Sequence, residues 1–576
     1  MAPENTPLLH DGRAAAPNHP SSVSSSPSRR EYEGDSGEEL DVANQVVTKK
    51  RAVAISLSAY VLVFLLAANM SGITMAQSVI AADLDAYEDA MWFTTSFLVA
   101  MSSTSPLTGK LAVVFSPRKM MLVSSLLFSL GCLITSLAQS FTVFIVGRVI
   151  TGLGGGGAIV LAFILVLELT TKRNRGLFIG LANAGVTMGV SLGAVVFGGL
   201  IATTGWRPLF WAQTPISLLA GFGIFFSIPS NLSAPGHSKD KAAQPLSTKL
   251  KQLDYLGAIF LACTVVLFLF GLSENIQPVP LASSVVSLVI FVLIEKYFAT
   301  DPIVPLTVLQ NRGALLSCVA QLGFMAARWT VLFYTPMTAL AVFGFNPAAS
   351  GSILIPTNLG FGIGGLLVGC TLQALHIRRA GSFWGASVLC FGLFGASLFA
   401  LSIFSTKDSP FPLYVAIVFL NGLFTGAAIN YTLAHLLHLT LPEAHYVATG
   451  LIGTFRGFAG SFGSAIGGGI FVRALRGSLE RGLRELDGGG SGELSPDREA
   501  LVRKLIGSPL MVYHGGLSGP EQEVAARGYS DGLRVLFQAA VVLAVAVIVL
   551  QAATGWRGPA EGARYREDEE EGVDSE

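Results

Sequence analysis

The sequence has few charged residues, and most of them lie in its two tails and a few loops. Charged residues make up 13% of the 576, roughly half the share found in soluble domains. The net charge is zero, so no nucleic-acid partner is expected. The five cysteines form no CxxC pair, which argues against a disulfide framework, a metal site or a cofactor. The sequence contains no cluster of histidine, aspartate and cysteine that would indicate a catalytic site, so we do not expect an enzyme. The lipid bilayer is the partner that this composition predicts.

Hydrophobic residues make up 51% of the chain and gather in fourteen windows of membrane-spanning length. A helix that crosses a bilayer needs about 20 mostly apolar residues. We therefore predict an all-α polytopic membrane protein with fourteen transmembrane helices. Twelve is the competing count, if two weaker windows merge or fail to insert.

Loop charges set the direction of these helices. Alternate loops are basic, as at Lys49 to Arg51 and at Lys172 to Arg175, whereas the first loop on the opposite side carries Asp83, Asp85, Glu88 and Asp89. Basic loops stay in the cytosol. Both tails are therefore expected there, in the plasma membrane or the vacuolar membrane. The polar residues 1–48 contain no signal peptide.

The expected organisation has six parts. They are a disordered cytoplasmic tail (1–48), an N-terminal six-helix bundle (49–228), a cytoplasmic linker (229–253), an inserted helix pair (254–300), a C-terminal six-helix bundle (301–552) with an extracytoplasmic loop at 474–532, and an acidic cytoplasmic tail (553–576).

The fourth window contains an arginine inside an apolar run. Arg148 is followed by Gly152 and by four glycines, Gly154 to Gly157. A guanidinium stays charged at any ordinary pH, and placing it in hydrocarbon costs several kcal/mol. This segment therefore predicts a polar cavity or a buried partner for Arg148. The glycines are not a phosphate loop, because no Lys-Ser or Lys-Thr follows them.

Glycines and charges recur at other helix ends. Gly109, Arg118 and Lys119 lie between the second and third windows, and Glu168 and Arg175 lie at the same membrane boundary. In the fifth window Gly185, Gly189 and Gly193 are spaced by four, which places them on one helix face, and Gly198 follows. We expect these glycines to permit close helix packing.

In this order and spacing, the segments resemble the major facilitator superfamily, and within it the fungal branch of fourteen-spanner drug:proton antiporters. The resemblance covers roughly residues 50–475 and 533–552. It implies two six-helix bundles with an added helix pair, and secondary transport driven by the proton gradient. It also implies a tight turn at Gly109 and a gate in which Glu168 pairs with Arg118 or Lys119 near Arg175. Val113 and Ala194 stand where that branch has aspartate and proline.

The acid that this branch usually carries in the first span is missing. Asn69 stands in its place, and no acidic residue lies near the middle of any span. An asparagine cannot carry a proton in alternation between the two sides. The remaining candidates are Glu168 and the histidines His435 and His438, whose ordinary pKa suits the task. Structural roles for the histidines are an equally good interpretation.

Polar residues in the spans suggest what could line a solute path. Arg328 and Arg456 join Arg148 as buried cations without a buried carboxylate, which favours neutral or anionic solutes. The candidate lining residues are Asn69, Arg148, Gln321, Arg328, Tyr334, Asn430 and Arg456. Each of the polar ones could instead join neighbouring helices.

The resulting hypothesis is an efflux pump that exports a drug, toxin or secondary metabolite as a monomer. A vacuolar transporter of amino acids or other small solutes is the first alternative. The N-terminal tail supports a vacuolar destination, because Glu4, Leu8 and Leu9 fit an acidic dileucine signal read by sorting adaptors. A membrane sensor that does not transport is the alternative from another class.

Overall fold

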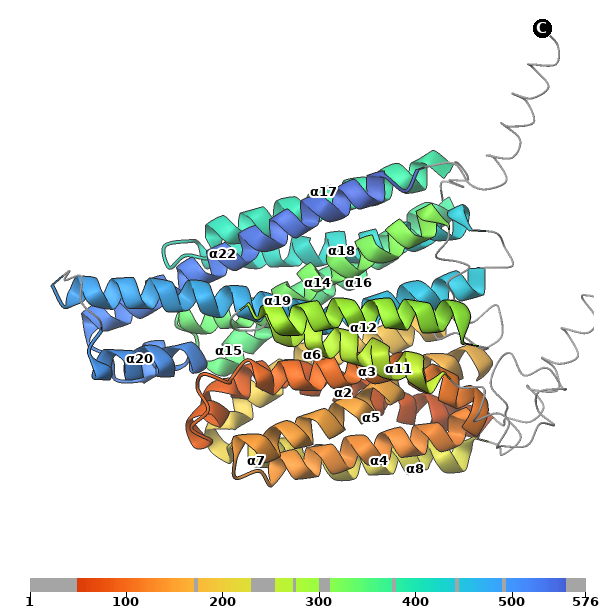
Figure 1. The fold of residues 1–576 in the computed structure, drawn as a ribbon, viewed down its shortest axis with the longest axis horizontal. Coiled ribbons are helices and arrows are strands. Elements are labelled where there is room, and N and C mark those ends of the chain that lie inside the picture. The colour runs from red at the N-terminus through yellow and green to blue at the C-terminus, as the bar shows by residue number, and fades with distance from the viewer. Residues whose placement is uncertain are drawn as a thin grey trace, which may run out of the picture. The chain divides into compact units, whose positions relative to one another are not determined.

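The computed structural model describes residues 49–169, 175–228, 254–272, 276–299, 311–374, 380–440, 445–488 and 494–555. Every regular element in these ranges is a helix (Figure 1). Thirteen helices there are long and apolar enough to cross a membrane. The expected all-α multi-pass membrane fold is confirmed, and the expected count of fourteen is approximate. The window outside the thirteen is α3 (Trp92–Phe115), which is 24 residues long but rich in serine and threonine.

The helices form two halves. The N-terminal half contains α2 (Lys49–Asp83), α3, α4 (Pro117–Ser136), α5 (Phe141–Leu169), α6 (Arg175–Thr204), α7 (Arg207–Trp211) and α8 (Gln213–Ser227). The C-terminal half contains α14 (Arg312–Ala341), α15 (Pro347–Ser352), α16 (Leu354–Ala374), α17 (Ala380–Phe404), α18 (Phe411–Leu439), α19 (His445–Leu486) and α22 (Gly519–Ala552).

The two halves repeat one packing scheme in the same chain order. In the first, α2 packs against α6 and α8, and α5 packs against α3 and α4. In the second, α14 packs against α19 and α22, and α18 packs against α16 and α17. Internal repeats of this kind are typical of secondary transporters, whose solute sites lie where the repeats meet.

A helix pair stands between the halves in the sequence and lies along their junction in space. α11 (Tyr255–Leu272) packs against α12 (Pro278–Tyr297) and also against α3 and α19. Val265 and Leu269 of α11 share an apolar cluster with Val99 of α3 and Ala465 of α19. The inserted pair therefore contacts both halves at once.

The expected loop at 474–532 is largely helical in its described part. α19 continues to Leu486, α20 (Pro496–Gly507) and α21 (Met511–His514) follow, and α22 begins at Gly519. Ser495 caps α20, and Ser518 with Glu521 forms a capping box at α22. The Tyr529 hydroxyl donates to the Leu505 carbonyl at 2.5 Å. The C-terminal end of α19, the helices α20 and α21, and the first turns of α22 form a cap, called here the α20 cap.

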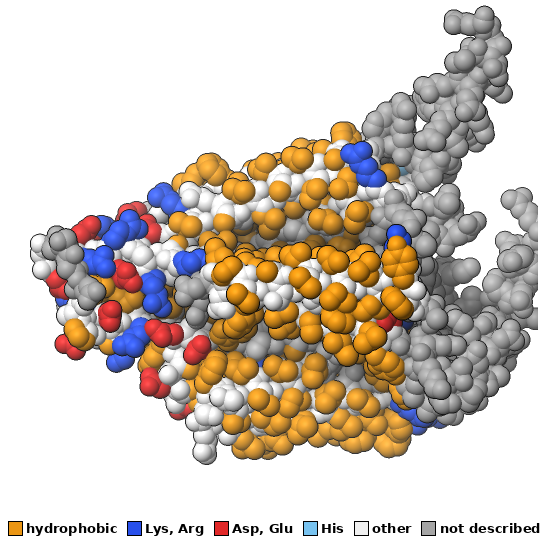
Figure 2. All heavy atoms as spheres, in the orientation of Figure 1, with side chains coloured by type: hydrophobic (Ala, Val, Ile, Leu, Met, Phe, Trp, Pro, Cys, Tyr) orange, Lys and Arg blue, Asp and Glu red, His pale blue; other side chains and the backbone are white. Residues whose placement is uncertain are grey.

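The α20 cap marks one end of the molecule. Lysine, arginine, aspartate and glutamate side chains gather on it, whereas the surface beside it is mostly hydrophobic (Figure 2). The cap also touches the N-terminal half, because the Leu510 amide donates to Ser78 Oγ at 3.3 Å. Such a division fits an apolar belt in the bilayer and a cap outside it.

Candidate functional site

Arg148 is completely buried in the N-terminal half. Its Nε donates to the Phe93 carbonyl at 2.8 Å, and its Nη1 donates to Asn69 Oδ1. The guanidinium also lies over the Phe97 ring, with its carbon 4.6 Å from the ring centroid. Asn69 in turn donates to Gln213 Oε1 at 3.0 Å. α2, α3, α5 and α8 are thus joined by a polar network in which amides take the place of a carboxylate.

Arg328 is the buried cation of the C-terminal half, with 2% of its surface exposed. Its Nη1 donates to Thr357 Oγ1 and, at 3.1 Å, to Asn421 Oδ1. Its Nη2 lies 3.4 Å from the Thr357 carbonyl and 3.5 Å from Asn358 Oδ1. This guanidinium is therefore held by α16 and α18, again through neutral acceptors.

The two arginines occupy exchanged places in the repeat. Arg148 on the fourth long helix of its half, α5, contacts Asn69 on the first, and Arg328 on the first long helix of its half contacts Asn421 on the fourth, α18. Each half therefore joins its first and fourth helices by an arginine and an asparagine, with the partners swapped. Such a pair fixes two helices to each other within one half.

The halves meet at the end that carries the α20 cap. Asn358 Nδ2 of α16 donates to Ser191 Oγ of α6 at 2.8 Å, and Thr95 Oγ1 of α3 lies 2.9 Å from Ser464 Oγ of α19. Gly198 lies so close to α15 that an added Cβ would be 2.4 Å from the Pro347 carbonyl oxygen. Hydroxyls, an amide and glycine make these contacts, and Arg476 of α19 adds a half-exposed ion pair with Glu88 of the N-terminal half at 3.7 Å.

The seam opens toward the other end. On α19, Gly460 lies against Leu98 and Trp329, whereas a Cβ at Gly457, Gly453 or Gly450 would meet no described atom within 4 Å. A helix turns 100° per residue, so these glycines point within 80° of Gly460. The face of α19 that touches the N-terminal half near the cap therefore borders open space farther away.

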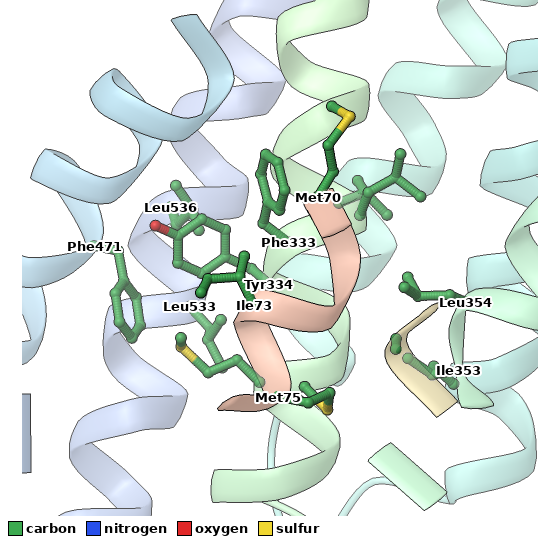
Figure 3. Packing of buried hydrophobic residues seen from close by; sticks show 14 of the residues in the cluster. Met70, Ile73, Met75, Phe333, Tyr334, Ile353, Leu354, Phe471, Leu533 and Leu536 are labelled. Carbon is green, nitrogen blue, oxygen red and sulfur yellow. The ribbon is translucent and has the colours of Figure 1, made fainter. Parts of the chain in front are cut away.

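Tyr334 lies in the closed part of the seam. It is buried, and its ring centroid is 5.1 Å from that of Phe471. Figure 3 shows it on the helix that carries Phe333, with Met70 and Ile73 of α2 alongside. A small pocket reaches Tyr334 from the cap end and is also lined by Thr74, Gln77, Thr94 and Ser464. Residues from both halves therefore share this pocket.

Gln321, Arg456 and Asn430 lie on α14, α19 and α18 of the C-terminal half, toward the end opposite the α20 cap. Gln321 is completely buried, and neither atom of its amide has a hydrogen-bond partner in the described part of the chain. Arg456 is half-buried and makes one long bond, 3.4 Å from Nη2 to the Ile429 carbonyl. Asn430 is exposed and bonds the Gly426 carbonyl at 2.9 Å. Gln321 and Arg456 therefore have hydrogen-bond donors without a partner among the described residues.

The family model described as the Major Facilitator Superfamily matches residues 59–464, which run from α2 through the inserted pair and into α19 of the C-terminal half. The chain belongs to the major facilitator superfamily.

Relatives within the superfamily are named as transporters. The "Vacuolar basic amino acid transporter 1" of Saccharomyces cerevisiae is 30% identical over 50% of this chain and 51% of that protein. "MFS transporter L2" of a Phoma species is 24% identical over 86% of this chain and 80% of its own length. The "Multidrug resistance protein fnx1" of Schizosaccharomyces pombe is 24% identical over 84% and 88%. The chain thus matches about half the length of the first of these and most of the others.

A solved superfamily structure has the same fold. A bacterial homologue of the human lysosomal transporter Spinster, in an inward-facing and unoccupied conformation, gives a TM-score of 0.59 at 13% identity. The match covers 88% of this chain and 97% of that one. At this identity the likeness establishes the architecture, and the chain is a major facilitator transporter rather than an enzyme by family and by the names of its relatives.

The turn implied at Gly109 lies elsewhere. Gly109 is inside α3, and the chain turns at Ser116, whose φ is +72° and ψ is 144°. The prediction of a tight turn at Gly109 is therefore wrong. The reason is that the helix-forming run Leu111 to Phe115 continues α3, and Pro117 starts α4 at its first position. Ser116 thus adopts a backbone conformation that glycine favours.

The implied gate is only partly described. Arg118 is half-buried, with its guanidinium carbon 4.2 Å from the centroid of the Phe225 ring, and Lys119 is exposed. The side chains of Glu168 and Arg175 lie outside the described residues. Their pairing therefore stays a prediction. The same holds for the sorting residues Glu4, Leu8 and Leu9, which also lie outside the described residues.

The glycines of the fifth span sit at two interfaces. A Cβ at Gly185 would meet the Tyr60 ring at 3.1 Å, one at Gly189 would meet the Phe64 carbonyl at 2.6 Å, and one at Gly193 would meet Ala68 Cα at 2.4 Å. These three lie against α2 within one half. Gly198 instead lies against α15 of the other half. Backbone contact at both places leaves no room for a side chain.

The two histidines of α18 lie toward its C-terminal end. His435 is buried, and its Nε2 is 3.0 Å from Thr554 Oγ1 beyond α22. His438 is half-buried. The contact of His435 joins α18 to the end of α22, a structural arrangement.

Several seam residues lack any signal in the sequence. Ser191, Thr95 and Ser464 are ordinary hydroxyl residues in hydrophobic runs, where each could equally bond its own helix. Their pairing depends on how the two halves dock. Spacing along one helix carries no information about that docking.

Proposed function

We propose that this transporter exports small organic compounds from the cytosol, and that it works as a monomer by alternating access. The supporting observation is the asymmetric junction of the halves, which touch at Ser191–Asn358 and Thr95–Ser464 but diverge beside Gly450 and Gly453. A rocking motion of two repeats about a central site would exchange the closed and open ends.

The orientation follows from the loop charges. The basic residues Arg118 and Lys119 in the first turn of α4 lie at the end opposite the α20 cap, and basic segments that flank spans face the cytosol. Both tails would then be cytoplasmic, the cap would face outward or into the vacuole, and the described state would open to the cytosol. Residues 49–228 and 301–552 would form the two six-helix bundles. Residues 229–253 would be the cytoplasmic linker, and residues 254–300 the inserted pair.

The names of several relatives support export. Efflux and multidrug names occur among them, as in the "Efflux pump dotC" of Dothistroma septosporum, which is 29% identical over 59% of this chain and 58% of that protein. Vacuolar basic amino acid transporters occur too, and the dileucine pattern at Glu4, Leu8 and Leu9 favours a vacuolar membrane. Buried arginines disfavour a cationic amino acid, so we place a vacuolar carrier of neutral or anionic solutes second.

A test compares accumulation of fluorescent dyes and candidate metabolites in cells with and without the protein. Expected is lower accumulation in cells that contain it, or accumulation in their vacuoles if the second function applies. Repeating the measurement with the proton gradient collapsed tests coupling, for which Asn69 offers no titrating group. No difference in any solute would overturn the export proposal.

A further inference from the structure

The three arginines inside the spans differ in how much of their hydrogen-bonding capacity the protein uses. Arg148 has two bonds and a stacked ring, although its Nη2 is buried without a hydrogen-bond partner among the described residues, and Arg328 has contacts with three residues. Arg456 has the single 3.4 Å bond to Ile429, and its Nε is buried without a hydrogen-bond partner among the described residues. A guanidinium offers five N–H donors. Arg456 therefore retains several donors for another molecule.

Gln321 is the second underused group. Its side chain is fully buried, yet its Nε2 and Oε1 both lack partners in the described ranges. A buried polar group without a partner costs about 1–3 kcal/mol. Most native proteins avoid this cost, so each exception calls for an explanation such as a bound water or solute.

The helix register places Gln321 and Arg456 in one layer. α14 and α19 run side by side, with Gly463 packed against Ala326. Arg456 lies seven residues before Gly463 on α19. Val319 lies seven residues before Ala326 on α14, two residues from Gln321. At a rise of 1.5 Å per residue, Gln321 lies about 10 Å and Arg456 about 13 Å from the layer of Arg328.

α18 passes through the same layer. It runs against α14 in the opposite direction, and Asn421 contacts Arg328. Seven residues beyond Asn421 is Ala428, beside the Ile429 carbonyl that Arg456 bonds. Gln321 lies on the face of α14 that carries Arg328, because seven residues turn a helix by 700°. Gln321 and Arg456 therefore both approach α18 near residues 428 and 429.

We infer that Gln321 and Arg456 bind an organic carboxylate that carries a hydroxyl or amino group beside it. This inference rests on the proposed function and names its class of solute. The free guanidinium donors of Arg456 match the carboxylate oxygens. Gln321 supplies a further donor through Nε2 and an acceptor through Oε1 for the neighbouring group.

The surroundings suit such a solute. Neighbouring residues on these helices form an apolar cluster of Ala314, Cys318, Leu436, Leu451 and Ile452, which would accept a hydrophobic body. Gly453 and Gly457, three residues before and one after Arg456, border open space and leave the approach clear. Arg456 disfavours a cation at this place, and the buried carboxyl of Glu295 lies one turn beyond Phe291 of α12, which belongs to the same cluster.

The test uses the purified full chain in lipid nanodiscs with salicylate as the probe. Salicylate carries a carboxylate beside a hydroxyl, benzoate lacks the hydroxyl, methyl salicylate lacks the charge, and benzyltrimethylammonium has the opposite charge. Binding is measured by calorimetry. We expect salicylate to bind about tenfold more tightly than benzoate, as one hydrogen bond allows, and the other two not to bind. Tighter binding of the cation or the ester would overturn the inference.

Two variants separate binding from folding. Arg456→Gln should weaken salicylate about 100-fold, as loss of charged hydrogen bonds allows, and Arg207→Gln, at a half-exposed arginine, should leave it unchanged. Gln321→Met should remove the preference for salicylate over benzoate and also raise the melting temperature of the free protein, because it removes an unpartnered amide. A lower melting temperature with unchanged binding would make Gln321 a structural residue and overturn its assignment.

The binding assay is independent of transport. Dye export in cells without salicylate binding would overturn this inference alone. Salicylate binding without movement of any solute in cells would overturn the proposed function and leave the carboxylate site intact.

Discussion

The guanidinium of Arg148 donates to the side-chain carbonyl of Asn69, so an amide holds the buried cation where a carboxylate would neutralise it. Asn69 can do this because its own amide is used by Gln213, which in turn bonds the Leu209 carbonyl at 3.0 Å. The charge of Arg148 is therefore solvated by a chain of dipoles and by the Phe97 ring. This network stays the same across the pH range in which carboxylates titrate.

Arg148→Ala should destabilise the protein and impair transport. The change leaves the Phe93 carbonyl and Asn69 Oδ1 without their donor, at about 1–3 kcal/mol for each buried group. We expect a lower melting temperature in detergent and slower solute export. Arg207→Ala is the control, since its ion pair with Asp83 is 2.8 Å long but about 40% exposed and contributes about 1 kcal/mol at most. Equal effects of both changes would contradict the structural role of the Arg148 network.

Asn69→Asp should make transport respond to pH. The variant places a titratable carboxyl beside Arg148 in a network that otherwise lacks one. We expect collapse of the proton gradient to slow export by the variant more than by the natural protein, measured as dye retention with and without a protonophore. Asn69→Gln keeps the amide and serves as the control. An identical response of both variants would show that this position has no part in proton coupling.

A cross-link between Thr95→Cys and Ser464→Cys should stop transport. The two hydroxyl oxygens are 2.9 Å apart across the seam, so sulfurs at these positions are close enough to bond. Oxidation would hold the halves together beside the α20 cap and prevent the seam from opening there. Reduction should restore export.

The single variants Thr95→Cys and Ser464→Cys control for oxidation of the natural cysteines, of which Cys263 is exposed. Full export by the oxidised double variant, with the cross-link verified by mass spectrometry, would contradict a seam that opens during transport.

The membrane fold could be predicted from the sequence because apolar windows of about 20 residues are best accommodated as helices that cross a bilayer. The partners of Arg148 were harder to predict. Its burial follows from its position, but its partners come from three other helices, and only Asn69 stood out in the sequence. Ser191 and Ser464 were not predictable at all, because a hydroxyl bonds its own helix as readily as another one.

Helix ends were the other weak point. The serines at 495 and 518 are capping residues, yet the charged stretch that follows Ser495 is typical of a loop unless the packing partners are known. Tyr529 supplies one of them through Leu505. The turn after α3 was misplaced at Gly109 because glycine is the usual marker of a turn, whereas Ser116 is not.

Ser116→Gly should stabilise the protein. With φ at +72° and ψ at 144°, Ser116 occupies a region that costs a residue with a Cβ about 1–3 kcal/mol. Glycine removes this cost but adds entropy to the unfolded chain, so we expect a net gain of about 1 kcal/mol. The measurement is thermal unfolding followed in detergent. Ser116→Ala is the matched control, since alanine keeps the Cβ, and a gain of the same size there would contradict backbone strain as the cause.

Asp89, in the loop between α2 and α3, should make the cap end more stable at mildly acidic pH. Burial, and secondly the neighbouring charge of Glu88, raises the pKa of Asp89 above its ordinary value. Its protonated form is therefore favoured by folding, and this contribution is full below a pH of about 4 and is lost as the pH rises through the folded-state pKa. Asp89→Asn, which cannot ionise, should raise the melting temperature at pH 7 and flatten its dependence on pH. Asp85→Asn, at an exposed position of the same loop, is the control, and a melting temperature that rises with pH equally in all three proteins would contradict this role of Asp89.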